Sequence, residues 1–279
     1  MRKLFSRQLI EARHEMLSIF EAIDLALHDA VRAYVTDDKK LATRTQEAAF
    51  RIDARCANLE AVCYNLIATQ SPVASDFRLL QTIIYIDFNL QRMCDKVRRI
   101  ARAAKRKVNN DIELPTEMVR LIEDEAQSVY RVLGATATAL VNNDLSCVLG
   151  LSEEDEAVHG AYQEFFRCFN RGANVELEDD SAMDDFRRTI MVSRYLDRIA
   201  SISMECAYRL VFLLTGQRWT AADLADTDED ELESMRIPSG EGVILKPSVD
   251  ARFVADLPLD EVGDELAELI RKATEDDRD

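Results

Sequence analysis

The sequence predicts an all-α protein built from two tandem antiparallel three-helix bundles. Two seams of mostly apolar residues, with steps of three and four positions, superimpose when one is shifted by 106 residues, and such seams are typical of helices packed in a bundle. The first seam is Leu79, Ile83, Ile86, Leu90, Met93, Val97 and Ile100, and the second is Thr189, Val192, Leu196, Ile199, Ser203 and Cys206. Glycine and proline are scarce, at 8 and 5 of 279 residues, which favours long regular elements. Only two copies are visible, so we expect a duplication and not an open-ended repeat.

The first two helices follow from the spacing of their apolar residues. We expect the first helix over about residues 5–34, a break at Asp37-Asp38, and the second helix over about residues 39–69. The side chains expected to face the core are Leu9, Met16, Phe20, Ile23, Leu27, Leu41, Phe50, Ile52, Leu59, Val62 and Leu66.

The third helix is expected to begin with Ser71 as its N-cap and Pro72 at its first position, where proline lacks only an N–H that would have no partner. It ends in a basic cluster made of Arg98, Arg99, Arg102, Lys105, Arg106 and Lys107. Cations there complement the helix dipole, an interpretation that we favour over a binding patch for lipid or protein. Asn109-Asn110 and Pro115 mark the end of the first bundle, which is assigned to residues 1–108.

The second bundle is assigned to residues 109–217. Its three helices are expected over about residues 116–141, from the turn at 142–144 to about 170, and over about 181–215. Gly216 is the expected C-cap of the last helix, because glycine adopts the left-handed conformation at little cost.

Residues 218–279 differ in character and are assigned to an acidic C-terminal tail. Acidic residues are dense from Asp223 to Glu233, and the segment holds three of the five prolines. A short strand or hairpin is expected over Val243–Phe253 and a helix over Leu259–Lys272. Disorder and partner binding are equally compatible with this composition.

The formal net charge of −17 argues against a nucleic-acid partner, because neutralising a phosphate backbone requires a basic face. The start Met1–Phe5 resembles that of a secretory signal, but Arg7, Gln8 and Glu11 interrupt any apolar stretch. No segment approaches the ~18 apolar residues of a membrane span. We therefore expect a cytoplasmic protein without a direct membrane span.

No catalytic arrangement is recognisable in the sequence. It shows no nucleophile paired with a base, no phosphate-binding loop and no glycine fingerprint. The six cysteines include no Cys-x-x-Cys pair, so we expect small buried thiols and not zinc or redox chemistry. The sequence thus predicts a protein that is not an enzyme.

Acidic residues and one histidine beside the seams are the candidate metal ligands. They are Asp53, Asp95, Asp155, His159 and Asp197. Asp53 and Asp95 can face each other if the second and third helices are neighbours, and the shift by 106 residues places His159 at the position of Asp53. Asp155 lies one turn before His159 on the same helix face. Such groups could hold a divalent or iron ion, the one cofactor left open.

A rim of ion pairs is the competing interpretation. Arg92 and Arg198 occupy equivalent positions beside the two seams. Carboxylates in such places more often line a solvated rim or pair with arginine than hold a metal.

The stretch Ile67–Leu80, which reads IATQSPVASDFRLL, resembles the opening of the third helix in the PhoU family of regulators of bacterial phosphate uptake. Tyr195–Ile199, ahead of Thr215-Gly216, is a second point of resemblance. The resemblance covers roughly residues 5–216, including the six-helix duplication, and leaves out the tail.

The resemblance implies a pair of three-helix bundles that represses phosphate import when phosphate is plentiful. The partners it implies are the ATPase subunit of the phosphate ABC transporter and the sensor histidine kinase of the phosphate regulon. A neutral or apolar patch on one bundle face is expected for that docking. A metal-binding bundle and an accessory regulator of another anion transporter are the alternatives, and a homodimer is left open.

The resemblance also implies a metal motif on the third and sixth helices, in which an acid is followed four positions later by aspartate. In this chain Gln91 replaces the first acid and Ser201 the last aspartate, while His159 replaces an aspartate on the fifth helix. The motif positions that remain are Asp53, Asp95 and Asp197. One carboxylate per copy of the motif favours a single-ion site or none over a multinuclear iron or zinc cluster.

Overall fold

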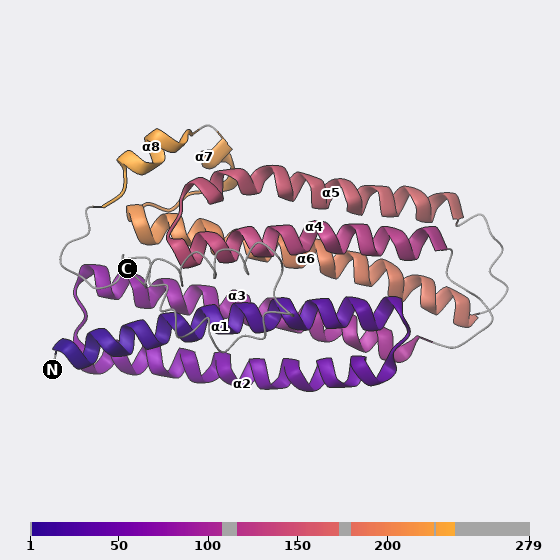
Figure 1. Ribbon diagram of the computed structural model, residues 1–279, viewed down its shortest axis with the longest axis horizontal. Helices are drawn as coiled ribbons and strands as arrows, with labels where there is room; N and C mark the ends of the chain where they lie inside the picture. The colour runs from indigo at the N-terminus through magenta and orange to yellow at the C-terminus, as the bar shows by residue number, and fades with distance from the viewer. Residues whose placement is uncertain (1, 108–115, 173–179, 226, 238–279) are drawn as a thin grey trace, which may run out of the picture. The chain divides into compact units, whose positions relative to one another are not determined.

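The computed structural model describes residues 2–107, 116–172, 180–225 and 227–237. Within these ranges the chain forms eight helices and no strand, so the predicted all-α class is confirmed (Figure 1). The helices are α1 (Arg2–Val35), α2 (Lys39–Gln70), α3 (Ala74–Arg106), α4 (Thr116–Asn142), α5 (Ser146–Gly172), α6 (Asp180–Thr215), α7 (Ala221–Ala225) and α8 (Glu229–Ser234). Among the described helices, none is long and apolar enough to cross a membrane.

The six long helices lie in one compact unit, Met1–Ile244. Within it α1, α2 and α3 pack against one another, and so do α4, α5 and α6 (Figure 1). The two sets meet where α3 packs against α6 and α1 packs against α4. The predicted domain limits after residues 108 and 217 stay predictions.

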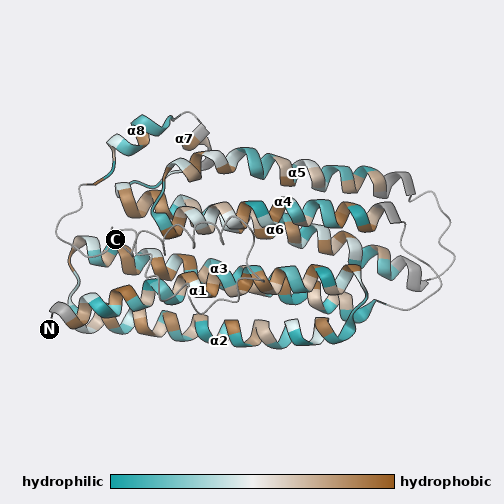
Figure 2. Cartoon of the chain, viewed as in Figure 1, coloured by the Kyte–Doolittle hydropathy of each residue, from teal (hydrophilic) through white to brown (hydrophobic). Residues whose placement is uncertain are grey.

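The two predicted seams form the centre of the core. All seam residues named above are buried on α3 and α6, because steps of three and four keep side chains on one helix face. The predicted core residues of α1 are buried as well. Figure 2 shows hydrophobic and hydrophilic positions interleaved along each long helix, as expected when one face is buried.

Two predicted core residues of α2 are exposed instead. Phe50 is 59% exposed and Val62 is 39% exposed. The buried stripe of the helix contains Ile52, Cys56, Leu59, Cys63 and Leu66. Phe50 is two positions from the buried Ile52, which places it about 200° away around the helix. The prediction was wrong because it accepted apolar residues that do not share one face.

The turns between the first helices depend on left-handed residues. Asp37 has φ 55°, and the Asp38 carboxylate caps α2 by accepting from the backbone N–H groups of residues 40 and 41, as the predicted break requires. The predicted N-cap role of Ser71 is wrong. Ser71 has φ 46° and ends α2, while Val73 is the N-cap of α3 and has no side-chain bond to the helix. Because α2 continues to Gln70, Ser71 is its C-cap and the chain reverses there. Pro72 follows just outside the helix, where proline is common.

The first part of the predicted tail contacts the bundle. Gly216 has φ 75° and its N–H donates to the carbonyl of residue 212, so its predicted C-cap role is confirmed. Beyond it, Leu224 of α7 and Leu232 of α8 are buried, and Arg236 donates to the carbonyl of Asn143 at 3.0 Å. The predicted hairpin and helix over residues 243–253 and 259–272 lie outside the described residues.

Polar contacts connect the first three helices to the next three. The Arg13 guanidinium, only 6% exposed, donates to the carbonyl of Leu140 at 2.9 Å and to Asn143 Oδ1 at 3.0 Å. The hydroxyl groups of Tyr34 and Thr189 lie 2.6 Å apart in the core. Buried polar groups that find partners across an interface specify its register as well as its stability.

All six cysteines are free thiols, and five of them are buried. Cys147 is partly exposed, and burial together with its contact to Asp144 raises the pKa of its thiol to about 11. The expectation of small buried thiols is therefore confirmed for five positions.

Candidate functional site

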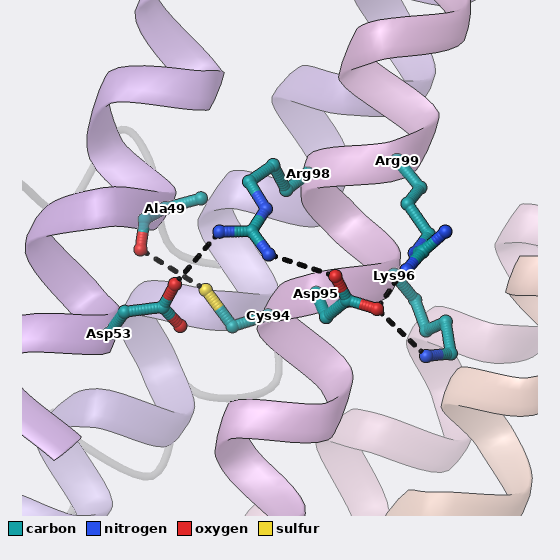
Figure 3. Close-up of polar contacts among 7 residues, drawn as sticks. All are labelled: Ala49, Asp53, Cys94, Asp95, Lys96, Arg98 and Arg99. Atoms are coloured by element: carbon teal, nitrogen blue, oxygen red, sulfur yellow. Dashed lines mark hydrogen bonds and ion pairs between the residues drawn. The ribbon is translucent and has the colours of Figure 1, made fainter. Parts of the chain in front are cut away.

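Arg98 of α3 lies between the two candidate ligands of the first half (Figure 3). Its Nη1 donates to Asp53 Oδ2 at 3.1 Å and its Nη2 to Asp95 Oδ1 at 2.9 Å. Asp95 Oδ2 also accepts from Arg99 Nε at 2.7 Å and from Lys96 Nζ at 3.1 Å. Burial disfavours the charge of Asp95, but these three donors outweigh it and hold its pKa well below the usual range.

The structure thus brings Asp53 and Asp95 together, as expected, but around a guanidinium group. A cation would have to displace Arg98 or share the two carboxylates with it, which like charge disfavours. Arg92, considered as a partner from the sequence, instead donates to Glu205 of α6 at 2.8 Å. Arg98 has this role because it follows Asp95 by three positions on the face of α3 that meets α2.

The candidates of the second half come close enough for their charges to interact. Burial raises the pKa of Asp155 on α5, and the negative charge of Asp197 on α6 raises it further. Burial also raises the pKa of Asp197, while the charges of His159 on α5 and of Arg198 and Arg194 on α6 oppose that shift. In the described part of the chain Asp155 and Asp197 form no ion pair with an arginine, which distinguishes this group from the first.

Glu125 of α4 belongs to the same neighbourhood, and the sequence analysis missed it. The residue is 0% exposed, and neither of its carboxylate oxygens has a hydrogen-bond partner among the described residues. Burial, with the charge of Asp197 adding to it, raises the pKa of Glu125 well above the usual range. Its spacing from Ile122 and Val129, both buried, places it within the apolar stripe of α4, and that spacing was visible in the sequence.

No group of three or more His, Cys, Asp or Glu side chains in the described ranges is arranged to hold a metal ion. The assignment of a metal to the five candidate residues therefore stays a prediction. The second half fits it better than the first, because no arginine bridges its carboxylates.

A pocket of about 500 Å³ lies along α2, α3 and the end of α6, and we call it the aromatic pocket. Its lining residues are Glu60, Tyr64, Gln81, Ile84, Tyr85, Asp87, Phe88, Gln91, Arg209, Phe212 and Arg218. Tyr64 is 54% exposed and Phe88 is 60% exposed. Phe77, 44% exposed, precedes Phe88 by eleven positions and so projects from the same face of α3.

Arg209 is held against two rings of the aromatic pocket. Its Cζ lies 4.8 Å from the ring centre of Tyr85 and 4.1 Å from that of Phe212, and the residue is only 7% exposed. Asp87 is 1% exposed and accepts from Gln91 Nε2 at 3.0 Å, and burial raises its pKa to about 6. Aromatic rings combined with arginine are typical of protein-binding surfaces.

The sequence predicted a neutral or apolar docking patch without locating it. Phe77 and Phe88 lie off the seam of α3 and are exposed in the structure. Phe88 lines the same pocket as Arg209 because α3 packs against α6, and the sequence did not show that packing.

The fold and these surfaces define a class, the duplicated six-helix bundle proteins in which polar groups flank each buried seam. Within that class, residues 16–104 of the chain match the PhoU domain.

Curated proteins and solved structures are similar to the chain over most of its length. The chain is 27% identical over 218 residues to the phosphate-specific transport system accessory protein PhoU homolog of Clostridium acetobutylicum, covering 78% of this chain and 97% of that protein. It is 24% identical over 235 residues to the phosphate-specific transport system accessory protein PhoU of Serratia marcescens, covering 84% of this chain and 92% of that protein. Its fold is similar to the crystal structure of the phosphate transport system regulatory protein PhoU from Streptococcus pneumoniae, with a TM-score of 0.68 and 20% identity over 77% of this chain and 99% of that one. Its fold is also similar to the crystal structure of PhoU from Pseudomonas aeruginosa, with a TM-score of 0.67 and 24% identity over 76% of this chain and 100% of that one.

Proposed function

We propose that the chain is an accessory regulator of a phosphate transport system, a cytoplasmic adaptor that lowers phosphate import and phosphate-regulon signalling. Relatives that align with most of its length carry that description in their names, which supports the proposal. In this role the chain is not an enzyme. Its partners are the ATPase subunit of the phosphate ABC transporter and the phosphate-sensing histidine kinase, as the family resemblance implies.

The aromatic pocket is the observation that carries the proposal. Large aromatic side chains exposed together mark interaction sites on soluble proteins, and rings with arginine dominate the binding energy of many interfaces. Tyr64 and Phe88 expose more than half of their surface. Arg209 is already fixed between two rings, so little side-chain freedom would be lost on binding. We therefore assign partner docking to this pocket, with the exposed rings as anchors.

The double substitution Tyr64→Ser and Phe88→Ser is expected to weaken binding of the ATPase subunit by about 30-fold or more. Anchoring aromatic residues typically contribute about 2 kcal/mol or more each, and one such loss already corresponds to about 30-fold in Kd. The measurement is the Kd from biolayer interferometry with the purified subunit, together with co-elution at low and high phosphate.

Phe50→Ser is the matched control, because Phe50 is as exposed as Phe88 but lies outside the aromatic pocket. It should bind the subunit as the parent does. Unchanged binding of the double variant would place docking elsewhere on the bundle. Binding to the ATPase of a different anion importer, with none to the phosphate system, would support the alternative of another anion transporter.

A metal-binding bundle is the second candidate function, favoured by the approach of Asp155, His159 and Asp197. In that case a divalent or iron ion should raise the unfolding free energy of the parent by about 2–3 kcal/mol at a hundredfold excess over its Kd. Asp197→Asn should abolish this gain, whereas Asp53→Asn should retain it, because Asp53 is already occupied by Arg98. Metal analysis of the purified protein and urea unfolding with and without the ion provide the measurement. Unfolding curves that do not respond to any added ion would eliminate this candidate.

A further inference from the structure

A second pocket, of about 630 Å³, lies between α2 and the end of α3, and we call it the basic groove. Its lining residues are Gln46, Phe50, Arg98, Arg102, Lys105 and Arg106. The four cations follow one another on α3 at intervals of four, three and one positions, so they gather along one side of the helix. The groove is therefore positive, although the chain carries a net charge of −17.

The structure divides the basic cluster of α3 into two groups. Arg98, Arg99 and Lys107 are paired with aspartates, at distances of 2.7 to 3.1 Å. Arg102, Lys105 and Arg106 are exposed and form no ion pair or side-chain hydrogen bond with any residue that the structure describes.

The helix dipole accounts for only part of this unpaired group. Lys105 and Arg106 lie in the last turn of α3, where cations are favourable. Arg102 lies a turn earlier and is within about one helical turn of four other cations. Like charges at this spacing destabilise a helix unless an anion neutralises them. Within the described residues, this group has no carboxylate partner.

The remaining lining of the groove consists of Gln46 and the apolar ring of Phe50. Phe50 is 59% exposed, and the Cζ of Arg98 lies 5.3 Å from its ring centre. Arg98 is itself anchored by Asp53 and Asp95, so the ring and this guanidinium form a fixed floor. A cleft lined by one sign of charge and a low-dielectric wall focuses its field on a bound ion.

We propose that the basic groove binds a compact anion with several linked phosphate groups. Guanidinium groups match phosphate oxygens with paired hydrogen bonds, and three free cations within two turns require a ligand of several negative charges. The volume is that of a small-molecule site, which favours a compact ligand over a peptide or nucleic acid laid across the surface. Nucleoside polyphosphates and inorganic polyphosphate share this chemistry. The exposed ring of Phe50 would add stacking only for the nucleotide. This proposal is independent of the docking assigned to the aromatic pocket.

Isothermal titration calorimetry of the full chain with tripolyphosphate and with ATP tests the proposal. One saturable site is expected, with affinity that falls as salt concentration rises. The triple variant Arg102→Gln, Lys105→Gln and Arg106→Gln should bind at least tenfold more weakly. The control triple variant Arg120→Gln, Arg131→Gln and Arg187→Gln removes the same charge from exposed positions of the second half and should bind like the parent. Circular dichroism and urea unfolding verify that both variants are folded.

Phe50→Ala distinguishes the two sources. If Phe50→Ala weakens the binding of ATP but not of tripolyphosphate, the ligand is a nucleotide. If Phe50→Ala binds each of the two ligands as tightly as the parent does, the ligand is inorganic polyphosphate. Absence of saturable binding to either ligand at low salt would overturn the proposal, and so would unchanged binding by the groove variant. Binding only to vesicles that contain phosphatidylglycerol would assign the cations to a membrane surface and would also overturn it.

Discussion

Replacing Arg13 with methionine is expected to lower the free energy of unfolding by about 2–4 kcal/mol. This is the largest loss that we expect from removing a single buried polar contact. Arg13 lies on α1, and its Nη2 donates to the carbonyls of Leu140 and Val141 at 2.9 and 3.2 Å and to Asn143 Oδ1 at 3.0 Å. These carbonyls are at the C-terminal end of α4, where a cation also complements the helix dipole.

Methionine preserves most of the packing of the arginine stem but leaves these acceptors without their donor. Part of the loss is offset, because the guanidinium no longer has to be buried; that burial lowers the pKa of Arg13 in the folded protein. Urea unfolding at neutral pH measures the change. Arg7→Met is the matched control: Arg7 is 76% exposed on the same helix, and its ion pair within the described residues is with Glu11, so its loss should stay within about 0.5 kcal/mol. Equal effects of the two substitutions would show that the contact between α1 and α4 contributes little.

Replacing Glu125 with glutamine is expected to make the protein less sensitive to alkaline pH. In the unfolded chain Glu125 loses its proton near its usual pKa of 4.5, whereas burial keeps that proton on the folded protein to a higher pH. Between the two pKa values the folded state binds more protons, so the stability contributed by this residue decreases as the pH rises, by up to about 1.4 kcal/mol per pH unit. Glutamine does not titrate, and the variant should gain stability over the parent across that window.

The measurement is the unfolding free energy of parent and variant at several pH values from 5 to 9. The difference should be smallest at pH 5, the end of the range closest to the usual pKa of the unfolded chain. The variant should then be the more stable protein by about 1–3 kcal/mol at the alkaline end. Other buried acids such as Asp87 titrate in both proteins and cancel in the difference. Glu11→Gln, at an exposed position, should follow the parent curve throughout. A constant difference between Glu125→Gln and the parent would contradict a raised pKa.

Much of the fold was predictable because helix periodicity is a local property. The seam from Leu79 to Ile100 and its copy from Thr189 to Cys206 specify a buried face whatever the partner helix is. Gly216 and Asp37-Asp38 were recognisable for the same reason, since their roles depend on backbone conformation at the end of a helix. Ser71 was misassigned because the dipeptide Ser71-Pro72 can begin one helix or follow another. The continuation of α2 decided between the two.

The sequence by itself determined the helical class, the duplication, the buried seams and the resemblance to the PhoU family. Only the tertiary structure decided that Arg98, and not Arg92, holds Asp53 and Asp95, and that Arg102, Lys105 and Arg106 have no ion-pair partner among the described residues. It alone joined Phe88 to Arg209 in one pocket and placed Glu125 near Asp197. The physical reason is that burial of an apolar stripe depends on spacing within one helix. The partner of a charge depends instead on the rotation and register of the neighbouring helix, and no spacing within a single helix encodes them.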